Sequence, residues 1–185
     1  MVKKIKIYNN FKIASSYKNS IILIGNFDGL HIGHQKLFKA AKKYKKNKIK
    51  LGVVTFDPIP KMFFNKKIFN YRLSNLNQKI KLFKKYDVDF IINKKFDLKF
   101  SKVKAYSFIK NILVNKIKPK YIFVSDNFRF GYKREGDVFL LKRFQEKFNY
   151  KLIKPETLLK KTKIISSTLI RKLLSNGKLN LANKS

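Results

Sequence analysis

The sequence predicts an α/β fold, with a doubly wound, mostly parallel five-stranded sheet and helices on both faces. Short apolar runs alternate with longer segments whose apolar residues recur at helical spacing, from one end of the chain to the other. Such β-α alternation builds parallel sheets, because a helix usually makes the crossover between two parallel strands. The five expected strands are 21–24, 51–56, 90–92, 121–124 and 150–153.

The segments between these strands each carry one apolar stripe that would pack a helix on the sheet. The stripes consist of Leu37, Phe38 and Ala40; Leu76, Ile80 and Phe83; Ala105, Phe108, Ile109 and Ile112; and Val138, Leu141 and Phe144. We expect Ser74 and Ser101 to be helix N-caps and Asn176-Gly177 to end a last helix. Ligands of such sheets bind beyond the carboxyl ends of the strands, so residues that follow a strand are the first candidates for a site.

Length and composition favour one cytoplasmic domain over residues 1–185. The chain has 185 residues, 44% of them hydrophobic, which suffices for one core. It contains no cysteine, which excludes disulfides, thiolate zinc sites and a cysteine nucleophile and fits a reducing compartment. The first 17 residues lack the apolar core of a secretion signal, and no run approaches the roughly 18 apolar residues of a membrane span. We therefore expect no membrane partner.

A formal net charge of +35 raises the alternative of a basic nucleic-acid-binding module. The composition of that charge argues against it, because only five of the 45 basic residues are arginine and the lysines are spread along the whole chain. Proteins that recognise nucleic acid usually concentrate arginine on one face. We expect solvated lysines and no specific nucleic-acid partner.

The segment after the first expected strand is rich in glycine and leads into a helix. It runs Gly-Asn-Phe-Asp-Gly-Leu-His-Ile-Gly-His over residues 25–34. A helix N-terminus offers free backbone N–H groups and a partial positive charge, which suit a phosphate. Gly25, Gly29 and Gly33 would let the backbone approach such a ligand closely.

His31 and His34 are the only histidines of the chain and lie one helical turn apart, so both can face one anion. One isolated histidine would more often be a packing residue, but two in this turn favour function. Two imidazoles without a carboxylate on the same face are too few ligands for a metal site. The glycine patterns of dinucleotide-binding strands and of P-loops are absent, which disfavours hydride transfer and P-loop hydrolysis.

A second candidate phosphate cradle lies near the carboxyl terminus. Ser166, Ser167 and Thr168 are three consecutive hydroxyl residues at the start of an expected helix, and Arg171 follows one turn later. One hydroxyl is explained by N-capping. In a chain that otherwise uses lysine, the arginine indicates a planar fork that grips two phosphate oxygens.

Four motifs in order resemble one family. They are the 25–34 run, Thr-Phe-Asp-Pro-Ile-Pro at 55–60, the 127–137 run and Ile-Ser-Ser-Thr-Leu-Ile-Arg at 165–171, followed by Asn-Gly-Lys at 176–178. The chain resembles the FMN adenylyltransferase (FAD synthetase) module of bacterial bifunctional riboflavin kinase/FAD synthetases, in the nucleotidylyltransferase superfamily, from about Ser20 to Asn183. The resemblance implies a Rossmann-like fold.

It also implies an activity: in-line transfer of AMP from ATP to FMN, giving FAD and pyrophosphate, with Mg²⁺ held mainly by the substrate phosphates. The residues that would act on the triphosphate and the leaving pyrophosphate are His31, His34, Ser167, Thr168 and Arg171. Those that would bind ATP are Gly25, Asn26, Phe27, Asp28, Gly29, Gly33 and Ser166. Those that would bind FMN are Asp57, Pro58, Pro60, Phe63, Asn127 and Phe128, although core packing explains either aromatic residue equally well.

The chain departs from the family pattern in three places. Ile59 replaces a usual histidine between two prolines, and Ser125 replaces a usual glycine. The sequence stops at Ser185, where relatives continue into a kinase module, so we expect no riboflavin kinase activity and a separate kinase that supplies FMN. Another phosphate acceptor, such as phosphopantetheine or glycerol phosphate, remains an alternative that the 127–137 run disfavours.

Overall fold

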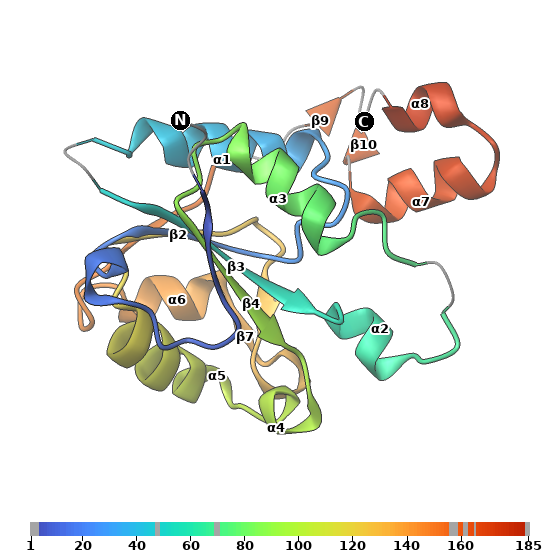
Figure 1. The fold of residues 1–185 in the computed structure, drawn as a ribbon. Coiled ribbons are helices and arrows are strands. Elements are labelled where there is room, and N and C mark those ends of the chain that lie inside the picture. The colour runs from blue at the N-terminus through green and yellow to red at the C-terminus, as the bar shows by residue number, and fades with distance from the viewer. Residues whose placement is uncertain are drawn as a thin grey trace.

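Six parallel strands form one sheet at the centre of the molecule (Figure 1). The computed structural model describes residues 4–46, 49–68, 71–155, 159–160, 163–164 and 166–183. The strand order is β1-β4-β3-β2-β5-β8, and every neighbouring pair is parallel. The strands are β1 Lys6–Tyr8, β2 Ile21–Ile24, β3 Leu51–Asp57, β4 Phe90–Lys95, β5 Tyr121–Phe123 and β8 Lys151–Ile153.

The predicted α/β class is confirmed, and the predicted count of five strands is wrong by one. The missed strand is β1, at the edge of the sheet, where Lys6 pairs with Phe90 of β4. Its three residues are exposed or half-buried, so it has no continuous apolar run to reveal it. Two short antiparallel pairs lie outside the sheet: β6 Arg129–Phe130 with β7 Gly136–Asp137, and β9 Leu159–Lys160 with β10 Lys163–Ile164.

Helices cover both faces of the sheet, α1 and α3 on one and α5 and α6 on the other (Figure 1). The helices are α1 Ile32–Lys43, α2 Pro60–Phe64, α3 Leu76–Lys84, α4 Leu98–Ser101, α5 Ala105–Ser107, α6 Val138–Phe144, α7 Ser167–Ser175 and α8 Leu179–Asn183. Two short 3₁₀ helices, η1 Ser15–Tyr17 and η3 Tyr132–Arg134, and a π-helix, η2 Phe108–Ile117, complete the set. Among the described residues, no helix is long and apolar enough to cross a bilayer.

Strand β2 shows how the sheet divides the core in two. Ile22 and Ile24 belong to the buried cluster that includes residues of α5, η2 and α6. Ile21 and Leu23 point to the opposite face, into the cluster that includes residues of α1 and α3. All four side chains are buried, because alternate residues of a central strand meet helices on either face.

The helix ends match the sequence in one place and differ in two. Helix α7 is followed by Asn176 and by Gly177 with φ of +70°, as predicted. The N-cap of α3 is Asn75, in a capping box with Gln78, and not Ser74. Ser101 is the last residue of α4, where its hydroxyl donates to the carbonyl of Leu98 at 2.8 Å, and it caps no helix. Asn75 caps α3 in place of its neighbour Ser74, whereas α5 begins after Lys104, whose side chain makes no capping hydrogen bond.

Strand β2 lies between β3 and β5, so the chain reverses its direction of progress across the sheet at this point. Crevices at such a reversal, beyond the carboxyl ends of the strands, bind ligands in open α/β sheets. The loop from Gly25 to His31 leaves β2 there and enters α1. In Figure 1, α2 and the α7–α8 pair lie at one end of the sheet.

Candidate functional site

The glycine-rich loop after β2 is held close to the core. Phe27 is buried, with φ of 47°, and its ring packs against His34 at 5.2 Å and against Phe38 at 5.1 Å between ring centroids. A Cβ atom on Gly29, where φ is +78°, would lie 2.8 Å from the side chain of Leu73. Phe27, predicted to bind ATP, is therefore a core residue whose ring packs against His34.

The two imidazoles stack on each other, with 3.7 Å between ring centroids and 25° between ring planes. His31 is the N-cap of α1, and its Nδ1 accepts a hydrogen bond of 3.4 Å from the backbone N–H of His34. Nδ1 of His34 is buried and has no hydrogen-bond partner within the part of the chain that the structure describes. Buried polar atoms are nearly always paired, so this unpaired nitrogen is an exception within the site.

Burial favours the neutral form of both histidines. Burial, and then the nearby Arg171 guanidinium, lower the pKa of His31 from 6.5 to about 4. Burial lowers the pKa of His34 well below 6.5, with further contributions from His31 and from the ammonium group of Lys79. The effect of Arg171 on His31 also means that the two predicted cradles lie close together, although 140 residues separate them in the sequence.

Asp28 is the residue that joins the segments of the site. Its side chain is only 2% exposed. Its carboxylate accepts hydrogen bonds from the backbone N–H of Leu73 at 3.0 Å and of Ser74 at 2.9 Å, and from the guanidinium of Arg171. The β2–α1 loop, the loop before α3 and helix α7 thus meet on one carboxylate. Asp28, predicted to bind ATP, is engaged by the protein itself.

Arg171 is held by protein groups on two of its three nitrogens. Its Nε donates to the carbonyl of Tyr71 at 2.7 Å, its Nη2 contacts Asp28, and the guanidinium lies 3.7 Å from the centre of the Tyr71 ring. Ser167 donates to the backbone carbonyl of Asp28 at 2.8 Å, and Ser166 caps α7. Helix α7 lies beside the turn that carries the two histidines, as predicted. Ser167 and Arg171 contact Asp28 of that turn directly.

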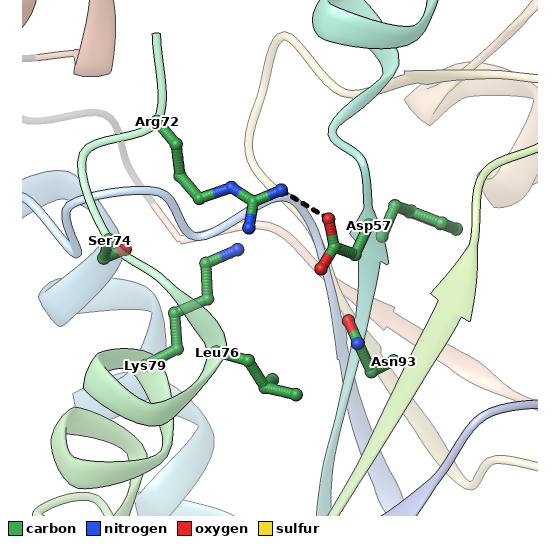
Figure 2. Close-up of a pocket in the computed structure, with 7 residues that line it drawn as sticks. Asp57, Arg72, Ser74, Leu76, Lys79 and Asn93 are labelled. Atoms are coloured by element: carbon green, nitrogen blue, oxygen red, sulfur yellow. Dashed lines mark hydrogen bonds and ion pairs between the residues drawn. The ribbon is translucent and has the colours of Figure 1, made fainter. Parts of the chain in front are cut away.

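A small pocket opens beside this cluster, at the carboxyl end of β3 (Figure 2). Arg72 forms an ion pair with Asp57 across it. Lys79, on α3, is only 5% exposed, and its Nζ donates to the carbonyl of Asn26 at 2.7 Å. Burial lowers the pKa of this lysine, Asp28 opposes that effect and Arg72 adds to it. The lining residues are Phe56, Asp57, Arg72, Ser74, Leu76, Lys79 and Asn93.

Tyr71, Arg72 and Lys79 were not predicted from the sequence, although signals for two of them existed. Lys79 lies on the same face of α3 as Leu76 and Phe83, so it is a charge inside an apolar stripe. Arg72 is one of only five arginines, and the argument applied to Arg171 holds for it too.

The residues predicted to bind FMN are divided between two places. Asp57 lines the pocket, Pro60 begins α2, and Phe63 packs on Phe96 at 5.3 Å. Asn127 and Phe128 follow β5, where Asn127 accepts from the Ser125 hydroxyl at 2.9 Å and Phe128 stacks on Phe130 at 5.4 Å. No hydrogen bond or ring contact among the described residues joins these two groups directly.

Three further predicted positions complete the description. Ile59, where the family usually has histidine, is buried at the N-cap of α2. Gly33 lies in the first turn of α1, and Thr168 is exposed in the first turn of α7.

The carboxylates of the described site do not form a cation site of their own. Within the described ranges, no group of three His, Cys, Asp or Glu residues could hold a metal ion. Asp28 is engaged by Arg171 and backbone donors, and Asp57 is paired with Arg72. That the substrate phosphates hold Mg²⁺ stays a prediction.

Comparisons with known proteins agree with this arrangement. The chain is 44% identical, over 99% of its length, to a bifunctional riboflavin kinase/FMN adenylyltransferase of Buchnera aphidicola subsp. Schizaphis graminum, and spans 59% of that relative. It is 32% identical, over 88% of its length, to the protein of that name in Escherichia coli, and covers 52% of it.

Two solved structures share the fold. One is titled a macrolide-efflux protein from Streptococcus pneumoniae, with a TM-score of 0.84, 24% identity and coverage of 98% of this chain and 70% of that one. The other is a pantoate-beta-alanine ligase from Francisella tularensis, with a TM-score of 0.60, 19% identity and coverage of 98% and 77%. At these identities the likeness concerns the fold alone. A model of the FAD synthetase family matches residues 13–169, and the chain belongs to the FAD synthetase family.

Proposed function

We propose that this chain transfers AMP from ATP to FMN, producing FAD and pyrophosphate. A phosphate oxygen of FMN attacks the α-phosphorus of ATP and forms the new P–O bond. The bond from that phosphorus to the bridging oxygen breaks, and its electron pair leaves with pyrophosphate. No covalent enzyme intermediate is needed, so the side chains act by positioning and by stabilising charge.

The observation that carries the proposal is the meeting of His31, His34, Ser167 and Arg171 around the Asp28 loop. A guanidinium and two imidazoles beside a helix N-terminus suit a polyphosphate. The family match and the curated relatives support the same reaction.

In this proposal the neutral imidazoles donate hydrogen bonds to the triphosphate without carrying a fixed charge. His34, with its unpaired buried Nδ1, lies deepest among them. Arg171 and the hydroxyl residues of α7 stabilise the leaving pyrophosphate, with Arg171 oriented by Asp28 and Tyr71. The phosphates of the substrates are the proposed ligands of Mg²⁺.

The test is direct. Purified protein is incubated with FMN, ATP and Mg²⁺, and FAD is followed by chromatography, with riboflavin plus ATP as a parallel reaction. We expect FAD in the first reaction, because a model of the FAD synthetase family matches residues 13–169, and we expect no FMN in the second. Absence of FAD at high enzyme concentration would refute the proposal.

A further inference from the structure

Five basic side chains gather at the site: Arg171, His31, His34, Lys79 and Arg72. Each acts on the next: Arg171 lowers the pKa of His31, His31 and Lys79 lower that of His34, and Arg72 lowers that of Lys79. The two imidazoles stack on each other. Ser167 and Arg171 contact Asp28 from α7, and Lys79 and Arg72 line the pocket.

Lys79 and Arg72 form a pair of cations whose charge is not fully compensated. A lysine that is 95% buried loses most of its hydration, which is costly unless an anion compensates for it. Among the described residues, its Nζ donates a hydrogen bond to a neutral group, the carbonyl of Asn26, at 2.7 Å. Asp28 and Asp57 attract its charge from a distance, but Asp28 is bound to Arg171 and Asp57 to Arg72. The two adjacent cations are therefore only partly compensated.

The pocket gives these cations a common target. In Figure 2 the ammonium group of Lys79 and the guanidinium of Arg72 point into the same space, facing Asp57, with Asn93 of β4 on its far side. The hydroxyl of Ser74 and the amide of Asn93 are further polar groups in the lining. Two cations with few competing anions suit a dianionic phosphate.

We propose that Lys79 and Arg72 form the subsite for the phosphate of FMN, which gives the attacking oxygen cations other than the Arg171 proposed to hold the leaving pyrophosphate. The inference rests on the proposed function and adds the position of the nucleophile to it. In-line displacement requires the attacking and leaving oxygens on opposite sides of the α-phosphorus. Two separate cationic groups, Lys79 with Arg72 at the pocket and Arg171 on α7, are available for these two oxygens.

The Asp57 carboxylate competes with FMN for Arg72 in this arrangement. Its pairing with Arg72 is partly exposed, with 39% of the Asp57 side chain and 31% of the Arg72 side chain accessible. A phosphate can therefore reach the guanidinium without unfolding any element. Asp57 keeps the cation oriented until FMN arrives.

The experiment compares FMN with riboflavin, which has the same ring system and lacks the phosphate. Equilibrium affinities are measured by quenching of flavin fluorescence in the wild type, in Lys79→Met and in Arg72→Gln. The matched control is Lys81→Met, an exposed lysine of the same helix that carries the same loss of charge. We expect each subsite variant to weaken FMN binding about 10- to 100-fold, the usual range for a charge-assisted hydrogen bond, and to leave riboflavin binding unchanged.

Preserved riboflavin binding also shows that a variant is folded. Equal weakening of both flavins, no weakening of either, or a wild type that does not prefer FMN would each overturn the inference. A rise in the KM for ATP with unchanged FMN affinity would overturn it as well, because the cations would then serve the triphosphate. FAD formation by the wild type is scored separately, so a failed subsite is distinguishable from a failed function.

Discussion

Two aspartate–arginine pairs lie in this site, and they differ in what surrounds them. Asp28 is 2% exposed and Arg171 17%, and the carboxylate also accepts bonds from Leu73 and Ser74. Asp57 and Arg72 are each about one-third exposed, and the described hydrogen bond of that carboxylate is to Arg72 alone. The first pair fixes three distant segments in place, whereas the second can exchange partners.

The difference changes how Arg171 is understood. From the sequence, its guanidinium is a grip for two phosphate oxygens. In the structure its Nε and Nη2 already bind Tyr71 and Asp28, so Nη1 and the second N–H of Nη2 are left for a ligand among the described contacts. In the proposed reaction Arg171 therefore acts on phosphate through its charge and these remaining N–H groups, from a position that the protein defines.

The largest effect should follow from Asp28→Asn. The amide places an NH₂ group against donors of Leu73, Ser74 and Arg171, and it leaves the arginine without its counter-charge. Removing one partner of a buried pair costs about 3–5 kcal/mol of unfolding free energy. Urea denaturation measures it, and Asp57→Asn is the matched control. Equal stabilities of the two variants would mean that burial does not separate the pairs.

The next effect is expected from Arg171→Lys, measured as the rate of FAD formation. A lysine keeps the charge but cannot reach both Tyr71 and Asp28, so the donor is lost from its position. Turnover should fall about 100- to 1,000-fold, as when one oriented donor is removed from a transition state. Arg143→Lys, at an exposed residue of α6, controls for the substitution. Turnover near that of the wild type would mean that neither the fork nor its anchoring matters.

These two pairs also show what the sequence could and could not predict. Strands β2, β3, β4, β5 and β8, the turn from β2 into α1 and the start of α7 were predictable, because buried apolar runs, glycine-rich turns and capping residues are local features. Strand β1 and the N-cap Asn75 were not, since edge strands lack such runs and several polar residues compete for a cap. The two roles of aspartate could not be separated either. Asp28 becomes a hub only because the loop before α3, about 45 residues away, folds over it.

The pH dependence of stability probes the two imidazoles of the site. The folded pKa of His31 is about 4, below 6.5, and that of His34 is also lowered, so between these values the unfolded chain binds more protons. The buried neutral imidazoles therefore contribute fully to folding stability above pH 6.5, and this contribution is lost as the pH falls toward 4.

Thermal unfolding of the wild type and of a His31→Asn/His34→Asn double variant would measure this contribution. Asparagine does not titrate and can still cap α1 at residue 31. The wild type should lose more stability than the variant between pH 7 and pH 4. Parallel curves would show that the imidazoles are accessible to protons in the folded state.

Asp57→Asn should have the smallest effect on stability. The direction of its effect on FMN affinity is the most informative result. Because the pair with Arg72 is partly exposed, the unfolding free energy should change by no more than about 1 kcal/mol.

Asparagine can still accept a hydrogen bond from Arg72, but it removes the charge that competes with a phosphate. FMN should therefore bind about two- to fivefold more tightly, with riboflavin unchanged. If Asp57 instead contacts the flavin ring, as its place among the predicted FMN-binding residues implies, both flavins would bind more weakly. The direction of the change in FMN affinity thus decides whether this carboxylate competes with the FMN phosphate for Arg72 or contacts the flavin ring.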